Sequence, residues 1–111
     1  MYRLTTPKHT FIFEIDPEET FETILITYAQ NGQIRLEKTK DDLSFETEDR
    51  DGKTVYLASC RLTQEETQKF TTRSRNTVDI QVRAGTAAGE WFASDIQHLT
   101  VHDVLNDKVL P

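Results

Sequence analysis

The sequence predicts an all-β protein: an antiparallel sandwich of immunoglobulin-like type, with about seven strands and one short helix. Three observations lead to this prediction. Several segments alternate apolar and polar side chains, which is the period of a strand with one buried face. Turn signals separate these segments at short intervals, and a length of 111 residues fits one domain with one core. We therefore expect residues 1–111 to form a single β-sandwich domain, and a small, partly open barrel is the alternative.

The first expected strand covers residues 10–15, where Phe11, Phe13 and Ile15 form one apolar face and Asp16-Pro17 ends the run. A second strand is expected from about Glu22 to Ala29. Its apolar face consists of Ile24, Ile26 and Tyr28. Asn31-Gly32 then turns the chain into a third strand around Ile34 and Leu36.

The register of this hairpin depends on its turn. A two-residue turn at Asn31-Gly32 would pair Ala29 with Ile34 and would scatter the large apolar residues over both faces. A type I turn over Ala29–Gly32, with a bulge at Gly32, pairs Tyr28 with Ile34 instead. It also pairs Ile26 with Leu36. We expect this bulged hairpin, because it collects the apolar residues on one face.

Charged residues dominate residues 37–53, where Leu43 and Phe45 are the only large apolar side chains. We expect a short edge strand there, followed by an exposed loop that turns at Asp51-Gly52. The next strand has an inward face of Tyr56, Ala58, Cys60 and Leu62. The sequence Thr63-Gln64-Glu65-Glu66 is a capping box, which predicts a short helix to about Phe70.

The clearest alternation in the chain follows, with Val78, Ile80, Val82 and Ala84 on one face. A loop over residues 85–89 leads into a last long strand from Glu90 to about Val101. Phe92 and Ile96 share one parity in this strand, whereas Leu99 and Val101 share the other. We therefore expect a bulge near Gln97-His98 that lets this strand serve two sheets.

Composition narrows the classes of partner. The chain has 13 basic and 19 acidic side chains and a formal net charge of -6, which disfavours nucleic acid or an anionic membrane as the main partner. The N-terminus is not followed by the apolar stretch of a secretory signal. Cys60 is the only cysteine, which is typical of a protein made in a reducing cytoplasm.

A zinc site is one chemical possibility that the pattern offers. His98 and His102 lie near Asp95 and Asp103, and two imidazoles with a carboxylate can bind zinc. Along one strand the two rings would lie about 13 Å apart, which is too far for one ion. We therefore expect surface histidines and no metal.

A calcium loop is a second possibility. The segment from Thr47 to Gly52 places Asp49, Asp51 and Gly52 at the third, fifth and sixth positions of a calcium-loop pattern. Thr47 and Ala58 occupy the first and twelfth positions, which lack the required carboxylates. An Asp-Gly turn in a solvated loop is the expected structure.

Three further groups of side chains could form a catalytic or binding site, but each has a simpler structural explanation. Cys60 with a distant histidine could form a nucleophile pair, but its inward position predicts a buried, inert thiol. Arg73, Arg75 and Arg83 form a small basic cluster without interleaved aromatic residues, which is typical of an ordinary surface. Trp91 and Phe92 could form an exposed platform for a sugar or a protein, but one of them must face the core, and for Trp91 we favour the core. The sequence thus assigns no catalytic residue, no cofactor and no metal.

Several segments carry a family resemblance. They are Thr10–Phe13, Ile26–Tyr28, Leu62–Thr67 with Phe70, Val78–Arg83, Ser94–Ile96 and Val101–Leu105. Together they resemble small proteins of the structural modules of tailed phages and prophages in Gram-positive bacteria. Those proteins are similar in turn to the N-terminal sandwich domain of phage baseplate upper proteins. The resemblance implies a non-enzymatic virion or assembly component that is present in the cytoplasm during assembly and then in the virion.

The leading hypothesis is therefore a structural protein that binds other virion proteins and further copies of itself. Its contacts are expected at the apolar C-terminal tail and on the second face of the early hairpin. The candidate interface residues are Leu25, Ala29, Trp91, Val104, Leu105, Val109 and Leu110. The alternative is a carbohydrate- or peptide-binding module, in which Trp91 and residues 37–53 line a groove.

Overall fold

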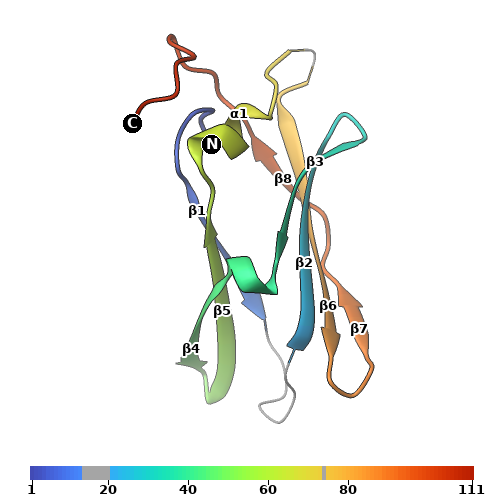
Figure 1. The fold of residues 1–111 in the computed structure, drawn as a ribbon. Coiled ribbons are helices and arrows are strands. Elements are labelled where there is room, and N and C mark those ends of the chain that lie inside the picture. Colours follow the sequence, from blue (N-terminus) through green and yellow to red (C-terminus); the bar gives the residue numbers. More distant parts are fainter. Residues whose placement is uncertain (14–20, 74) are drawn as a thin grey trace.

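Two antiparallel sheets face each other in the computed structural model, which describes residues 1–13, 21–73 and 75–111 (Figure 1). The three-stranded sheet has the order β1-β5-β4. Its strands are β1 (Lys8–Phe13), β4 (Ser44–Arg50) and β5 (Lys53–Arg61).

The second sheet has five strands in the order β3-β2-β6-β7, and β8 also pairs with β6. Its strands are β2 (Phe21–Gln30), β3 (Gln33–Thr39), β6 (Thr77–Thr86), β7 (Trp91–Ala93) and β8 (Gln97–Thr100). A 3-10 helix, η1 (Lys40–Asp42), connects β3 to β4, and helix α1 (Gln64–Gln68) follows β5. The expected all-β sandwich is confirmed.

The core lies between the two sheets, and most of its residues are the alternating ones that the sequence pattern assigns to it. From β2, β5 and β6 the buried apolar residues are Ile24, Ile26, Tyr28, Val55, Ala58, Cys60, Val78, Ile80, Val82 and Ala84. In β5 the expected alternation does not extend to the start of the strand, because Val55 is buried whereas Tyr56, predicted to face inward, is only half-buried. Phe11 and Phe13 of β1 pack against this cluster, as expected. The predicted inward position of Ile15 and the strand end at Asp16-Pro17 lie outside the described residues.

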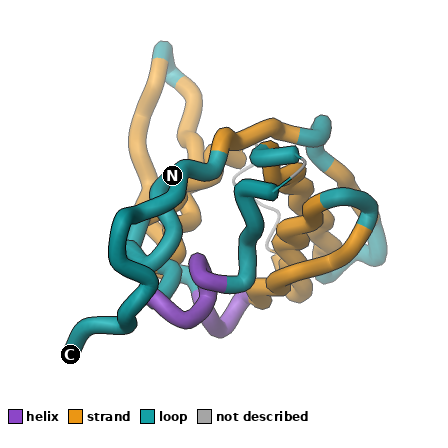
Figure 2. The backbone as a smooth tube through the Cα atoms, turned by 90° about the horizontal axis from the view of Figure 1, so that it is seen from above, coloured by secondary structure: helices purple, strands orange, loops and turns teal. Residues whose placement is uncertain are grey.

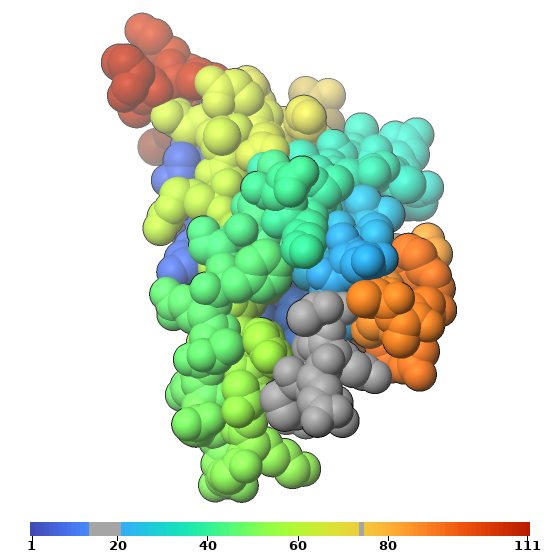
Figure 3. Space-filling view, turned by 60° about the horizontal axis from the view of Figure 1, so that its bottom comes forward, coloured from blue at the N-terminus to red at the C-terminus, as the bar shows by residue number. Residues whose placement is uncertain are grey.

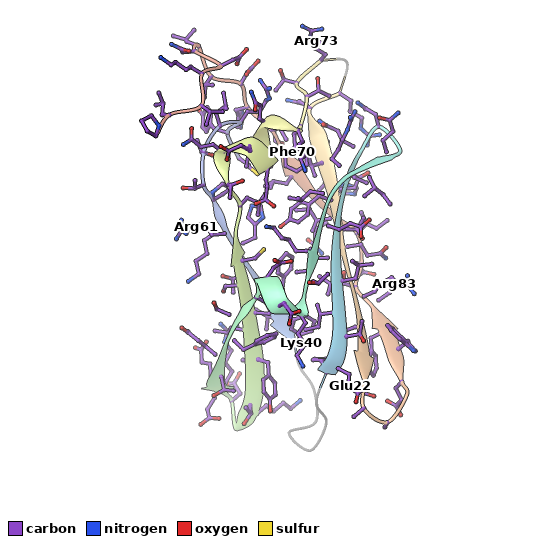
Figure 4. All side chains as sticks on the ribbon, in the orientation of Figure 1. Glu22, Lys40, Arg61, Phe70, Arg73 and Arg83 are labelled. Carbon is purple, nitrogen blue, oxygen red and sulfur yellow. The ribbon has the colours of Figure 1, made fainter. Side chains whose placement is uncertain are left out.

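Helix α1 begins with the predicted capping box. The Thr63 hydroxyl oxygen accepts a hydrogen bond from the Glu66 amide at 3.1 Å, and the Glu66 carboxylate accepts one from the Thr63 amide at 2.9 Å. Phe70, just beyond the helix, is buried between the sheets near one end of the sandwich (Figure 4). The predicted short helix and its apolar anchor are confirmed.

The register predicted for the β2–β3 hairpin is wrong. Asn31 and Gly32 both have positive φ, at 53° and 76°, so a two-residue turn connects the strands and Ala29 pairs with Ile34. The register then shifts between Tyr28 and Ala29, so that Tyr28 pairs with Leu36 and Ile26 with Lys38. The bulged residue is Arg35 of β3, which has no partner in β2. A bulge at this position allows a two-residue turn and still places Leu36 on the apolar face. It leaves Ile34 on the outer face, 63% exposed.

The prediction of an exposed loop before Asp51 is also wrong. Residues Ser44–Arg50 form a regular strand, β4, which pairs with β5 from Ser44↔Ser59 to Arg50↔Lys53. Every residue of β4 is exposed, and the strand lies at the edge of its sheet. A strand without a buried face has no alternating apolar pattern, so its sequence looks like a loop. The expected turn at Asp51-Gly52 is confirmed, and both residues have positive φ.

The single long strand predicted from Glu90 to about Val101 is replaced by two short strands, β7 and β8, which both pair with β6. Arg83 of β6 pairs with Ala93 of β7, and Ile80 of β6 pairs with Gln97 of β8. Between these pairs β6 advances by three residues (83 to 80) and its partner by four (93 to 97), which explains the observed change of apolar parity. The extra residue thus lies before the expected Gln97-His98 position, and the two strands stay in one sheet.

The N-terminal segment connects the two sheets. Its residues Met1–Arg3 run parallel to residues 100–102, with hydrogen bonds between Arg3 N and His102 O and between His102 N and Met1 O. After Pro7 the chain enters β1 of the opposite sheet. Within the described ranges, no helix is long and apolar enough to cross a membrane.

Candidate functional site

Three polar side chains, one each from β1, β2 and β5, contact one another in the core. Tyr28 Oη lies 2.7 Å from His9 Nδ1 and 3.9 Å from Cys60 Sγ. The His9 and Tyr28 rings are stacked, with centroids 5.6 Å apart. His9 is opposite Cys60 in the β1–β5 register, so both side chains point inward from the three-stranded sheet to meet Tyr28 from the other sheet.

Burial keeps these groups neutral. Desolvation raises the pKa of the Cys60 thiol and the pKa of the Tyr28 hydroxyl. Desolvation, together with the nearby N-terminal charge, lowers the pKa of His9. A neutral imidazole can form the observed hydrogen bond with the Tyr28 hydroxyl in either tautomer, whereas a buried neutral thiol is a poor nucleophile. The geometry therefore favours a structural role for Cys60, which is buried and free.

A largely buried ion pair at the margin of the core lies beside these three side chains. Lys38 Nζ of β3 is 2.6 Å from Glu66 Oε2 of α1, and the exposed fractions of the two side chains are 11% and 19%. Lys38 points into the core because it pairs with Ile26 after the β3 bulge. Burial alone would raise the pKa of Glu66, but the hydrogen bonds from Lys38 and from the Thr63 amide outweigh it and lower this pKa. The pair joins β3 to the helix that follows β5.

The two histidines of the zinc pattern have separate partners. His98 Nδ1 lies 2.7 Å from Asp79 Oδ1 on the outer face of the five-stranded sheet. His102 instead packs on Tyr2, with ring centroids 5.0 Å apart. In the parts of the chain that the structure describes, no group of three or more His, Cys, Asp or Glu side chains could hold a metal ion.

The calcium-like segment is part of a hairpin. Thr47 and Asp49 lie on β4, Asp51-Gly52 is the turn, and Ala58 lies on β5 opposite Phe45. The Asp49 carboxylate accepts a hydrogen bond from the Thr54 hydroxyl at 3.2 Å. An extended hairpin of this kind cannot wrap its side chains around one ion.

Arg83 lies apart from Arg73 and Arg75, the other two arginines of the predicted basic cluster. Arg73 lies at one end of the molecule, and Arg83 lies on β6 far from it (Figure 4). These arginines do not form one positive surface.

Trp91 is exposed, contrary to the expectation that it faces the core. It is 61% exposed, and Phe92 is 46% exposed, so neither aromatic residue is buried. Trp91 pairs with Gly85, which itself pairs with Thr23, on the outer face of the five-stranded sheet. A Cβ on Gly85 would lie 3.0 Å from three carbon atoms of the indole, so the ring lies directly on the glycine backbone. The pattern could not show this, because β7 is an edge strand beside a glycine.

Leu25 and Ala29, two further predicted interface residues, are half-buried on the same outer face. Ile34 lies opposite Ala29 on this face and was missed, since its inward or outward position depends on the bulge.

The C-terminal tail, residues 104–111, has a fixed backbone and exposed leucines. The Gln64 side chain forms two hydrogen bonds with the backbone of Leu110, at 2.8 and 3.0 Å. Arg3 forms ion pairs with Asp103 at 2.8 Å and Asp107 at 3.4 Å, just before and within the tail. Leu105 is fully exposed and Leu110 is 61% exposed, whereas Val104 and Val109 are half-buried.

The tail and Trp91 are at opposite ends of the sandwich. The C-terminus lies beside α1, whereas the β6–β7 turn that precedes Trp91 lies at the other end (Figure 1). The predicted interface residues therefore form two separate surfaces. Trp91 and β4 also belong to different sheets, and Trp91 faces outward, so the expected groove between Trp91 and residues 37–53 is not formed by the described residues.

No known protein-family model matches this chain. A search among curated proteins likewise finds no match.

Proposed function

We propose that this protein is a non-enzymatic structural or assembly component of a phage or prophage particle, which acts through protein–protein interfaces. The phage assignment rests on the resemblance of its strands to small phage structural proteins. The partners would be other virion proteins and further copies of the chain. The net charge of -6 supports protein partners over nucleic acid.

One observation carries the proposal for an interface. The tail backbone is tied to the folded body by Gln64 and Arg3, yet Leu105 and Leu110 extend into solvent. Exposed leucines cost free energy in a monomer, and an ordered backbone lowers the entropy that binding must overcome. A surface built in this way is suited to a partner that covers the leucines.

Truncation after Asp103 tests this proposal. Sedimentation at several protein concentrations is expected to show association of the full chain and loss of that association in the truncated chain. The double substitution Leu105→Ser and Leu110→Ser should have the same effect, while the control Lys108→Gln, at an exposed tail residue, should not. If the full chain is monomeric throughout and truncation only lowers the melting temperature, the tail belongs to the core and the proposal fails.

Gene neighbourhood tests the phage assignment separately. Portal, capsid or tail genes beside this gene would support a virion protein. A neighbouring polysaccharide locus would support the second candidate function.

That second candidate is a carbohydrate- or peptide-binding module, and the exposed indole of Trp91 favours it. An indole held flat over Gly85 is a rigid apolar surface of the kind that sugar rings and peptide side chains contact. Titration with oligosaccharides, followed by the fluorescence of the single tryptophan, is the measurement. Unchanged emission with the oligosaccharides would remove the carbohydrate-binding candidate, and the same titration with peptides tests the other.

A further inference from the structure

We infer that the free edge of β4 binds an extended segment of another protein that carries basic side chains at alternate positions. The contact would add a fourth strand to the three-stranded sheet. This site is distinct from the tail and does not depend on the function proposed above.

The hairpin of β4 and β5 extends beyond the rest of the sandwich. The view from above shows it standing clear of the other elements (Figure 2), and the space-filling view shows its end projecting from the body (Figure 3). Every residue of β4 is exposed, and its pairing with β5 is continuous over all seven residues without a bulge. Its outer edge is therefore straight and open to a further strand.

The turn determines which backbone groups this edge offers. Arg50 and Lys53 flank the two-residue turn and form a hydrogen-bonded pair, so hydrogen-bonded and non-hydrogen-bonded pairs alternate from there. The N–H and C=O groups of Phe45, Thr47 and Asp49 consequently point away from β5. These residues supply a regular row of donors and acceptors at the free edge.

The other sheet edges are less suitable. β3 is interrupted by its bulge, and the segment Met1–Arg3 runs beside the end of β8. In β1, every second residue is half-buried. Among the described strands, β4 thus offers the most complete edge.

The side chains of β4 favour a basic partner. Glu46 and Glu48 lie on one face of the strand together with Arg50, which forms an exposed ion pair with Glu48 at 3.2 Å, and Phe45 and Thr47 lie on the other face. With Asp49, the strand carries three acidic side chains and one basic side chain, so its charge remains negative. In an added antiparallel strand, the residues opposite Glu46 and Glu48 would form the non-hydrogen-bonded pairs, where side chains are closest. Lys or Arg at these two positions, with an apolar or Thr residue between them, would complement the edge.

A second copy of β4 would not be a suitable partner. In the fully overlapped antiparallel register Glu46 would lie opposite Glu48, and a shift of two residues would place one of these glutamates opposite itself. Like charges directly opposite each other destabilise a strand pair. The acidic edge thus discourages self-pairing and selects a basic strand.

Two methylated peptides test the contact directly. The probe is acetyl-TVKVKVT-amide, whose lysines lie opposite Glu46 and Glu48 when it pairs antiparallel with β4. N-methylation of its three valines removes the donors that face β4 and should weaken binding by about tenfold or more. N-methylation of its two lysines changes only the far edge and should change affinity by less than about threefold. Fluorescence anisotropy of labelled peptide measures the affinities, and equal binding of the two methylated peptides would overturn the proposal.

Protein variants locate the site. Glu46→Lys with Glu48→Lys should abolish binding of this probe and allow binding of the same peptide with glutamates in place of lysines. Glu37→Lys with Glu90→Lys makes the same charge change at exposed residues of the other sheet region and should leave binding nearly unchanged. If both double variants weaken binding equally, the attraction is a general charge effect and the inference fails.

Thr47→Pro removes one outward donor without removing a bond to β5, and Thr47→Val is its control. Proline should block the peptide and valine should not, with equal melting temperatures as the test of folding. If the proline variant does not fold, the two methylated peptides still decide the question. Truncation after Asp103 should leave peptide binding intact, so failure of the tail proposal and failure of this one are distinguishable. Concentration-dependent association that Thr47→Pro abolishes would instead show that a second copy occupies this edge.

Discussion

Breaking the largely buried pair of Lys38 and Glu66 should destabilise the protein more than breaking an exposed pair. The change Glu66→Gln keeps an oxygen for the Thr63 amide but leaves the Lys38 ammonium without a counter-charge in the core. The change Lys38→Met leaves the Glu66 carboxylate with its cap but without its cation. The double change removes both charges and keeps the side-chain volumes.

The distance sets the size of the effect. At 2.6 Å and an effective dielectric constant of about 20, two unit charges attract by about 6 kcal/mol, and desolvation of each ion offsets several kcal/mol of this. We expect Glu66→Gln to cost about 2–3 kcal/mol and Lys38→Met about 1–2 kcal/mol. The double variant should cost about 2 kcal/mol less than the sum of the two. For a chain of this length, each kcal/mol corresponds to about 4 °C in melting temperature.

Chemical unfolding of the four proteins in the cycle measures this coupling. The exposed pair of Arg50 and Glu48, at 3.2 Å with both side chains 48% exposed, is the matched control. Its cycle of Arg50→Met and Glu48→Gln should give a coupling under about 0.5 kcal/mol. Equal coupling in the two cycles would refute the reasoning, because it would show that burial does not strengthen the core pair.

The sign of the pH dependence follows from the lowered pKa of Glu66. A carboxyl whose pKa is lower in the folded state contributes stability above its unfolded pKa, and this stability is lost as the pH falls through the folded pKa. The wild-type protein should therefore lose stability in the acid range more steeply than Glu66→Gln does.

Four further predictions concern other parts of the core and surface. Cys60 should react with a thiol reagent only as fast as the protein opens, and rapid stoichiometric labelling of the native protein would contradict this. Because burial lowers the pKa of His9, its contribution to stability should be present above about pH 6.5 and should decline below that pH. Unfolding curves for His9→Gln should show less of this decline. Parallel pH profiles of stability for the two proteins would refute the role of His9. Gly85→Ala should displace the Trp91 indole, shift its fluorescence and cost about 1–3 kcal/mol, and this cost should shrink when Trp91 is also replaced by Leu. Thermal melts with a chelator, with calcium and with zinc should coincide, and a shift of several degrees with zinc would revive a site at His98.

The sequence by itself determined the parts of the fold that depend on local chemistry. Alternation placed Ile24, Ile26 and Tyr28 on one face, and the capping box placed the start of α1 at Thr63. The turn residues Asp51-Gly52 predicted the turn that they form. Each of these features is determined by side chains within a few residues of one another, so one sequence suffices to predict them.

Only the tertiary structure decided the features that depend on neighbouring strands. The two-residue turn places Ile34 opposite Ala29 on the outer face, and the β3 bulge after it turns Leu36 and Lys38 inward. The strand β4 exists because β5 offers it a partner, although its own sequence has no buried face. Trp91 is exposed because its edge strand places it over Gly85, outside the core.

The same distinction between local sequence and tertiary structure applies to the two candidate surfaces, the tail and the free edge of β4. The apolar tail was predicted because an apolar terminus is unusual in any sequence, but its attachment through Gln64 and Arg3 required residues far apart in the chain to meet. The free edge of β4 was not predictable either, since an edge is defined by the absence of a neighbour in a sheet whose order the sequence does not show. Composition and local pattern thus determine which residues can be buried, and the pairing of strands decides which of them remain exposed for a partner.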